Sequence, residues 1–323
     1  MIGCGFIGRT LGETFRTDER STLTAIAEVD SKVRKRVGDK FGLAPEARHE
    51  DYEAMFESHD LDAVLVATPH TLHYDQITAA MDRGMDVLCE KPLTTDMDEA
   101  TALVERAESG DEVLMVGYQR HLNPAYKRAR NRFRGSADPE FITAEITQNW
   151  IDRFENAWRT DPELSGGGYL YDTGSHILDA ICWTTGLEPA WVDAEMEFAD
   201  DDQRVDVRAV LTIGFENGAT ATVSVYGDAP AVREHIHIWD EDGAVYLEGR
   251  EWEQRSYSEV DAESTTREPY IRSGDEDKAA AFLDSVLDGT EPPATARDAL
   301  VVTAISEAAY ESARSGERVA VEY

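Results

Sequence analysis

Short apolar runs and helix-spaced apolar residues follow one another along the first third of the chain. Residues 63–67 form a continuous apolar run, as expected of a strand buried on both faces. After the opening glycines, Ile7, Leu11 and Phe15 recur every four residues, which is the spacing of a helix face. Further strands are predicted at 23–29, 87–89 and 113–116, and further helices near 75–83 and over 97–108. This order predicts a parallel sheet with helices on both faces.

The pattern changes after about residue 118, where predicted strands follow one another without helices between them. These strands are predicted at 141–150, 205–213, 220–225, from 236 onward and at 244–247. Asn217-Gly218 lies between two of them and is a strong hairpin signal, because both residues tolerate positive φ. We expect a mostly antiparallel sheet with one buried face, with His235 and His237 on the outer face. Two apolar-faced helices follow between about 275 and 315.

The net charge of the chain argues against two classes of binding partner. The chain carries 65 acidic and 31 basic residues, for a net charge of -34, so it would repel nucleic acid and an anionic membrane surface. Only six of the basic residues are lysines, and the acidic residues are spread along the whole chain. This composition favours a protein of a salt-accumulating halophile, where salt screens self-repulsion. An acidic protein of an ordinary organism is the alternative.

Cysteine usage and hydropathy point to the cytoplasm. Cys4, Cys89 and Cys182 are scattered and form no paired motif, which suits a reducing compartment. No apolar run approaches the roughly 18 residues of a membrane-spanning helix, and nothing at the start resembles a secretion signal. No cluster of histidine, cysteine or carboxylate residues has metal-ligand spacing, so we expect no metal.

The start of the chain carries a phosphate-binding signature. Gly3, Gly5 and Gly8, with Phe6 and Ile7 between the last two, match G-x-G-x-x-G. The glycines allow a tight turn, a close approach of backbone to a pyrophosphate, and close packing of the following helix. Only Met1 and Ile2 precede the motif, so the first strand is clipped or the true start lies upstream.

A candidate ribose-binding acid lies about 20 residues beyond the glycines. Asp30 ends the predicted 23–29 strand, where such a carboxylate hydrogen-bonds ribose hydroxyls. Asp30 would repel a 2′-phosphate, so we expect NAD as cofactor. NADP stays possible because Lys32, Arg34 and Arg36 follow closely; alternatively these three form a solvated helix face.

Three further motifs resemble those of the Gfo/Idh/MocA oxidoreductases, which include glucose-fructose oxidoreductase and inositol dehydrogenase. They are Glu90-Lys91-Pro92, the segment 67–73 (ATPHTLH) and the segment 166–176 (GGGYLYDTGSH). The resemblance extends to the C-terminal AYESA at 309–313 and so covers the chain essentially end to end. It implies a Rossmann NAD(P)-binding domain over 1–118. It also implies a substrate and oligomerisation α+β domain over 119–323, with the C-terminal helices packing back toward the first domain.

The resemblance also assigns roles to residues. Lys91, Asp172 and His176 would form the catalytic set, with Lys91 lowering the pKa of a substrate hydroxyl and His176 taking its proton. Asp172 precedes His176 by four residues, so on a helix the two would share a face. The nicotinamide side would be lined by Thr68, Pro69, His73, Glu90 and Lys91.

The substrate side is predicted more broadly. Its candidates are Tyr118, Arg120, Trp150, Arg153, Trp158 and Arg159. The alternative for each is core or surface packing. His70 is expected to be a loop residue.

The resemblance implies a dehydrogenase that moves a hydride between nicotinamide and a hydroxyl-bearing carbon of a sugar, polyol or inositol. A homodimer or homotetramer is expected. Two alternatives keep the same fold: a glycoside hydrolase acting by transient oxidation with tightly held NAD, and a non-catalytic regulator that senses a sugar or NAD.

Overall fold

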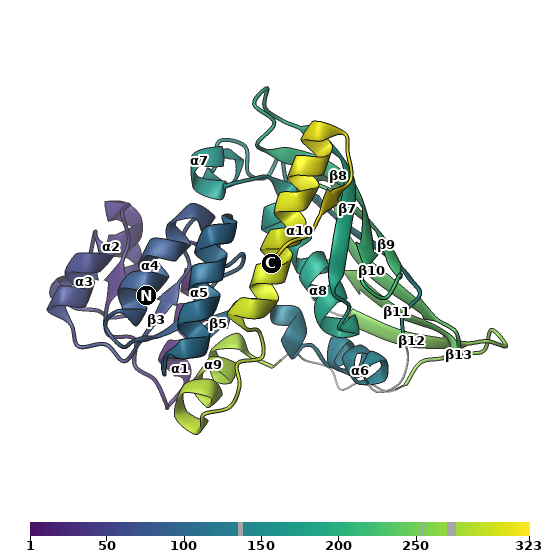
Figure 1. The fold of residues 1–323 in the computed structure, drawn as a ribbon. Helices are drawn as coiled ribbons and strands as arrows, with labels where there is room; N and C mark the ends of the chain where they lie inside the picture. The colour runs from purple at the N-terminus through teal and green to yellow at the C-terminus, as the bar shows by residue number, and fades with distance from the viewer. Residues whose placement is uncertain (135–137, 253–254, 270–275) are drawn as a thin grey trace. The chain divides into compact units, whose positions relative to one another are not determined.

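The computed structural model describes residues 1–134, 138–252, 255–269 and 276–323 (Figure 1). Its contacts separate into two compact units. The first unit contains Met1–Thr94, Asp98–Gly117 and Glu276–Arg297, and the second contains the remaining described residues. Each unit has its own sheet and core, described in turn below.

The first unit is built on short parallel strands. They are β1 (Ile26–Ala27), β2 (Arg48–His49), β3 (Ala63–Val66), β4 (Asp86–Cys89) and β5 (Leu114–Val116). β3, β4 and β5 pair in that order, and β1 pairs with β2. Ile2 forms parallel bridges to both Ala27 and Val66, so it joins the two groups of strands. The strand interiors are buried and apolar, as in parallel sheets covered on both faces.

Helices connect these strands. They are α1 (Phe6–Thr17), α2 (Ser31–Lys40), α3 (Tyr52–Ser58), α4 (His73–Met81) and α5 (Met97–Ser109). α2 and α3 begin at aspartates, because Asp30 and Asp51 each accept hydrogen bonds from two backbone N–H groups of the first turn. The predicted Rossmann arrangement of alternating strands and helices is confirmed.

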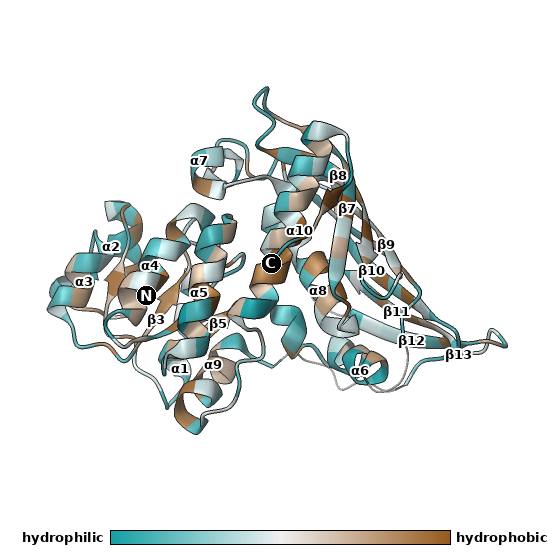
Figure 2. Cartoon of the chain, in the orientation of Figure 1, coloured by the Kyte–Doolittle hydropathy of each residue, from teal (hydrophilic) through white to brown (hydrophobic). Residues whose placement is uncertain are grey.

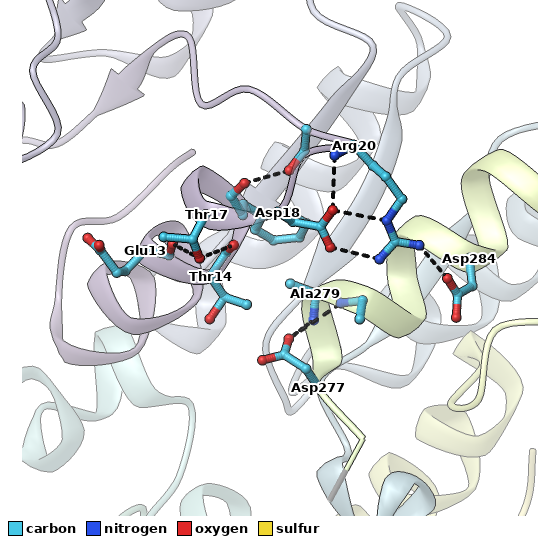
Figure 3. Close-up of polar contacts among 11 residues, drawn as sticks. Glu13, Thr14, Thr17, Asp18, Arg20, Asp277, Ala279 and Asp284 are labelled. Carbon is cyan, nitrogen blue, oxygen red and sulfur yellow. Dashed lines mark hydrogen bonds and ion pairs between the residues drawn. The ribbon is translucent and has the colours of Figure 1, made fainter.

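A late segment of the chain belongs to the first unit. α9 (Lys278–Asp288) begins at the cap residue Asp277 and contacts the end of α1 (Figure 3). Arg20 pairs with Asp284 at 2.6 Å, and the rings of Phe15 and Phe282 meet edge to face at 6.1 Å. The predicted start of the terminal helices, about residue 275, lies outside the described residues.

The second unit contains a nine-stranded sheet. Its strands are β6 (Phe141–Asn149), β7 (Pro189–Phe198), β8 (Asp206–Phe215), β9 (Thr220–Tyr226), β10 (Asp228–Asp240), β11 (Gly243–Arg250), β12 (Arg255–Asp261), β13 (Thr266–Arg267) and β14 (Val319–Ala320). The spatial order is β13-β12-β11-β10-β6-β9-β8-β7-β14. Only β6 and β9 pair in parallel, so the predicted mostly antiparallel sheet is confirmed. The hairpin at Asn217-Gly218 is also confirmed, with Gly218 at φ +91°.

Helices pack on one face of this sheet. They include α6 (Pro124–Phe133), α8 (Ser175–Thr185) and α10 (Ala296–Ser315), whereas the short α7 (Pro162–Ser165) contacts the neighbouring 3-10 helix Trp158–Thr160. Ser312 of α10 accepts a hydrogen bond from the backbone N–H of Ala194 in β7, and α8 contacts β6. Figure 2 shows hydrophobic colour on α8 and along the strands. None of the described helices is long and apolar enough to cross a membrane.

One predicted element is too long. The strand expected at 23–29 is ordered as β only at Ile26–Ala27. The strand is short because only two residues of its partner β2 pair with it, and because Asp30 already caps the next helix.

Candidate functional site

The glycine turn has the geometry that a dinucleotide requires. Gly3 has φ +83°, and a Cβ there would lie 2.4 Å from the carbonyl oxygen of Ala67. A Cβ on Gly8 would lie 2.2 Å from the carbonyl oxygen of Gly3, so the helix approaches the turn closely. At Gly5, no atom of the described residues lies within 4 Å of an ideal Cβ. The turn is therefore packed on one side and open at its middle glycine.

The open side faces the start of α1. The N-cap of this helix is Gly5, which has no side chain to occupy the first N–H groups. A helix start with free N–H groups and a positive dipole end is an anion-binding site. The residues present therefore fit a dinucleotide pyrophosphate, with Gly3, Gly5, Phe6, Ile7 and Gly8 supplying the backbone.

The acid at the end of β1 is Glu28, which the sequence reasoning missed. Its carboxylate accepts hydrogen bonds from the backbone N–H of Cys4 at 2.8 Å and of Asp30 at 3.0 Å. Glu28 thus lies directly against the glycine turn. The signal that could have found it is its position as the first residue after the strand.

In the structure, the carboxylate of Asp30 caps the start of α2. One of its carboxylate oxygens accepts hydrogen bonds from the backbone N–H groups of Lys32 at 2.7 Å and Val33 at 3.1 Å. These two bonds, from Val33 and then Lys32, lower the pKa of Asp30. The predicted ribose-binding residue is therefore the N-cap of α2.

One of the three basic residues after Asp30, Arg34, is held by contacts within the protein. Arg34 donates to the carbonyl oxygens of Glu28 and Val29 and pairs with Glu50 at 3.1 Å. This guanidinium holds the chain at the end of β1. Lys32 and Arg36 also lie in α2.

The His73 ring contacts backbone in the segments that follow β3 and β4. Its ring nitrogens lie 2.8 Å from the carbonyl oxygen of Pro92 and 3.0 Å from that of Thr68. Burial, reinforced by neighbouring His70, lowers the pKa of His73 to about 4. The side chain is fully buried and both nitrogens face backbone, so it supports the loops after β3 and β4, and its place beside the nicotinamide stays a prediction. His70, expected in a loop, is in a short 3-10 helix and is also buried.

The loop after β4 carries the predicted lysine. Lys91 is half-buried and its peptide bond to Pro92 is cis. The neighbouring Glu90 is nearly buried and pairs with Lys278 at the start of α9. Thr68, after β3, donates to Gln76 Oε1 at 2.7 Å, and Pro69 follows it. Thr68, Glu90 and Lys91 therefore all follow the carboxyl ends of adjacent parallel strands, where ligands of such sheets bind.

In the second unit, Asp172 lies in a π-helix, Leu170–Gly174, directly before α8. Its Oδ2 accepts a hydrogen bond from Trp150 Nε1 at 2.7 Å and one from Arg159 Nε at 3.0 Å. The expectation that Asp172 and His176 share a face assumed an α-helix. Because a π turn widens the spacing, the four-residue rule does not apply over this segment. Single π turns inside helices are frequent at functional sites.

His176 begins a chain of ring contacts. Its ring meets Tyr118 edge to face at 6.2 Å, and Tyr118 stacks on His121 at 6.2 Å. His121 in turn lies 2.8 Å from a carboxylate oxygen of Asp179, and both side chains are buried. His176 itself is 7% exposed, so its ring orientation is set by packing.

The glycine-rich loop before Asp172 is anchored by Asp206. This carboxylate accepts hydrogen bonds from the Leu170 N–H at 2.9 Å and from the Tyr310 hydroxyl, which itself accepts one from Gly168 N–H at 2.8 Å. Burial raises the pKa of Asp206 to about 6. The anchor therefore fixes the start of the segment that carries Asp172 and His176.

Three predicted substrate residues are buried. Tyr118 and Trp150 are 2% and 0% exposed, and Arg120 is 2% exposed and pairs with Glu234. In the structure Trp150 donates to Asp172 and the Tyr118 ring meets that of His176, so these residues support the predicted catalytic side chains, and their own contact with substrate stays a prediction. Arg120 belongs to a buried cluster with Glu234, Arg255 and Tyr126.

The other three candidates gather near Asp172. The Arg159 guanidinium lies 4.3 Å from the Trp158 ring centroid and 4.5 Å from that of Phe154. Arg153 is exposed and lies 5.5 Å from the same Phe154 ring. Aromatic rings beside a few placed polar groups are typical of small-molecule sites. Within residues 1–134, 138–252, 255–269 and 276–323, no group of three or more metal-ligating side chains occurs.

Two family models match the chain. The model described as "Oxidoreductase family, NAD-binding Rossmann fold" matches residues 1–118. The model described as "GFO/IDH/MocA C-terminal domain" matches residues 137–246. Together they cover more than half of the sequence.

Individual proteins agree with these matches. The chain is 28% identical over 310 residues to D-xylose 1-dehydrogenase (NADP(+)) 2 of Haloferax volcanii, covering 91% of this chain and 90% of that protein. It is 27% identical over 210 residues to scyllo-inositol 2-dehydrogenase (NAD(+)) of Bacillus subtilis, covering 64% and 60%. An oxidoreductase domain protein from Kribbella flavida has the same fold, with a TM-score of 0.87, 22% identity and coverage of 100% and 98%.

Proposed function

This chain belongs to the Gfo/Idh/MocA family of NAD(P)-dependent oxidoreductases, and from that membership we propose that it oxidises a hydroxyl-bearing carbon of a sugar or polyol. The observation that supports this most is the open glycine turn at the uncapped start of α1, which suits a dinucleotide. The similar xylose and inositol dehydrogenases support the substrate class.

The chemistry divides between cofactor and protein. Held at the glycine turn, a bound NAD would supply the hydride acceptor, and the hydroxyl proton of the substrate would then have to leave to a base of the protein. We assign that proton to the His176 imidazole, whose orientation is held by the Tyr118 ring. The Lys91 ammonium would stabilise the developing alkoxide, and the Asp172 carboxylate would hold a neighbouring substrate hydroxyl.

We propose NAD as the preferred cofactor, on different grounds from those in the sequence. Glu28, at the end of β1 and against the glycine turn, is placed to accept the ribose hydroxyls. Its charge would repel a 2′-phosphate. Arg34, a cation close behind Asp30, is already held by Glu50 and backbone oxygens. Steady-state kinetics should therefore give a higher kcat/KM for NAD than for NADP.

The test of the activity is turnover of sugars, polyols and sugar acids at high salt, read by absorbance of the reduced cofactor. Lys91→Ala and His176→Ala should each abolish most of kcat while leaving cofactor binding measurable. Near wild-type turnover in both variants would reject the assigned roles. Stoichiometric co-purification of NAD with hydrolysis of a glycoside would favour the transient-oxidation alternative. Tight cofactor binding without any turnover would favour the regulator.

We propose a cytoplasmic homo-oligomer. The thiols of Cys4, Cys89 and Cys182 are free, which suits a reducing compartment. The outer face of the nine-stranded sheet carries partly exposed aromatic side chains, with Phe141 and Trp239 stacked at 5.3 Å. Such a patch favours a subunit contact. Light scattering coupled to size exclusion should give a dimer or tetramer.

A further inference from the structure

Arg159 is a half-buried cation of the second unit that is bonded to Asp172, one of the predicted catalytic residues. It lies in a short 3-10 helix, Trp158–Thr160, and its side chain is 25% exposed. Within the described residues, its only hydrogen bond is the one that Nε donates to Asp172. The guanidinium is therefore anchored at one nitrogen, and no described residue accepts a hydrogen bond from the edge formed by its two terminal nitrogens.

The plane of this guanidinium is also fixed. Its central carbon lies 4.3 Å from the Trp158 ring centroid and 4.5 Å from that of Phe154. Cation–π contacts of this kind restrain the group without using its N–H donors. Arg159 thus presents a preorganised pair of N–H donors beside Asp172.

Two N–H donors on one rigid edge match a carboxylate. An arginine edge binds the two oxygens of a planar anion through parallel hydrogen bonds, which is stronger and more directional than binding a single hydroxyl. Arg153, which lies 5.5 Å from the same Phe154 ring, adds a second positive charge to this segment.

We propose that Arg159 binds a carboxylate of the substrate, so that the enzyme prefers sugar acids over the corresponding neutral sugars. This proposal rests on the proposed dehydrogenase function and narrows its substrate class. It also separates two roles of Arg159: the Nε edge orients Asp172, whereas the terminal nitrogens select the substrate.

The test compares matched substrates. D-glucuronate with D-glucose, and D-galacturonate with D-galactose, differ only in whether the terminal carbon is a carboxylate. The wild-type protein should show the higher kcat/KM for the acid of each pair. Arg159→Gln should lower the ratio of acid to neutral kcat/KM by about 10- to 100-fold, the value of a charge-assisted hydrogen-bond pair. Arg159→Lys should keep part of the ratio, because it keeps the charge and loses the planar edge.

Arg128 supplies the matched control. It also lies over an aromatic ring, 5.2 Å from Tyr257, with one carboxylate partner, Glu259 at 3.3 Å. Arg128→Gln should leave the acid-to-neutral ratio unchanged. If Arg159→Gln lowers kcat/KM equally for acids and neutral sugars, Arg159 only positions Asp172 and the proposal is wrong, although the dehydrogenase function stands.

A binding measurement separates the two proposals. Calorimetric titration with D-galacturonate should show binding to the wild-type protein that weakens in Arg159→Gln. If that Arg159-dependent binding occurs while no sugar, polyol or sugar acid is oxidised, the carboxylate site stands and the dehydrogenase proposal fails. If neutral sugars are oxidised and galacturonate does not bind, the reverse holds.

Discussion

At the scale of single residues, we expect cofactor choice to depend on the different positions of Glu28 and Asp30. Both acids follow β1, but the carboxylate of Asp30 is occupied by the first turn of α2 and that of Glu28 contacts the glycine turn. Each carboxylate accepts two backbone N–H groups, so occupancy does not separate them; position does, because only Glu28 contacts the glycine turn, at Cys4. Glu28 is therefore the better partner for a ribose.

Paired substitutions test this choice. Glu28→Ser should raise the ratio of NADP to NAD kcat/KM by about tenfold or more, because it removes a negative charge that would repel the 2′-phosphate of NADP. Asp30→Ser should leave that ratio unchanged, since serine also caps helices well. A ratio that responds to Asp30→Ser and not to Glu28→Ser would restore the assignment made from the sequence.

Asp206 predicts a pH-dependent contribution to stability. Burial raises its pKa from 3.8 to about 6, so the folded state holds this proton more tightly than the unfolded state. The resulting stabilisation is complete below about pH 4 and is lost as pH rises through about 6. Relative to wild type, Asp206→Asn should therefore gain about 2 kcal/mol in unfolding free energy between those two pH values.

Urea unfolding at constant salt measures that difference. Asp193→Asn is the control, because Asp193 is exposed on β7 and its removal changes the same net charge. A pH-independent difference between wild type and Asp206→Asn would show that the aspartate titrates normally in the folded protein.

At the scale of elements, the buried carboxylate of Glu234 accepts hydrogen bonds from side chains of several helices and strands. Glu234 of β10 accepts hydrogen bonds from Arg120, from Arg255 of β12 and from Tyr126 of α6. Burial alone would raise the pKa of Glu234, but Arg120 and then Arg255 hold it at about 2. Because this value lies below the ordinary one, the stabilisation is present at neutral pH and is lost only as pH falls toward about 2.

Glu234→Gln should lower the unfolding free energy by about 3–5 kcal/mol at neutral pH, because it removes the buried negative charge that Arg120 and Arg255 both contact. Glu259→Gln provides the comparison, since Glu259 is 25% exposed and pairs with arginines nearer solvent. That variant should lose no more than about 1 kcal/mol. Equal losses measured by denaturant titration would mean that burial does not strengthen the Glu234 cluster.

Elements with a clear apolar period could be predicted from the sequence. α1, β3, β4, α5 and the β8–β9 hairpin all follow from local spacing and turn residues. β7 was missed although Val192, Ala194 and Met196 alternate with acidic residues, which is a strand signal. The π-helix that carries Asp172 has no such signal, because it depends on how the segment packs.

The residues of the candidate site also fall into two groups: those recognisable from local sequence and those that depend on the fold. The glycines and Lys91 are recognisable because their chemistry is local in sequence. The bonds of Asp172 to Trp150 and Arg159 join segments 22 and 13 residues apart, so spacing could name these residues and not pair them. Burial of Arg120 and His73 is likewise a tertiary property, which residue type alone does not reveal.

At the scale of the whole molecule, electrostatic repulsion governs the conditions in which the chain folds. Acidic residues outnumber basic ones 65 to 31, so even complete pairing would leave a surplus of 34 negative charges. Added salt weakens both the surface ion pairs and the repulsion between surplus acids. Exposed pairs contribute only about 0–1 kcal/mol each, whereas the surplus charges all repel one another. Relief of repulsion should therefore prevail.

We accordingly expect the midpoint of thermal unfolding to rise with KCl from 0.1 M to about 1 M, as the Debye length falls from about 10 Å to about 3 Å. Most of the gain should occur in that range, because little unscreened repulsion is left beyond it. Sucrose at matched osmolality separates screening from solute exclusion, since it acts without ions and should give a smaller rise. A midpoint that falls with KCl would mean that attractive pairs outweigh the surplus charge, and that the acidic surface is not an adaptation to salt.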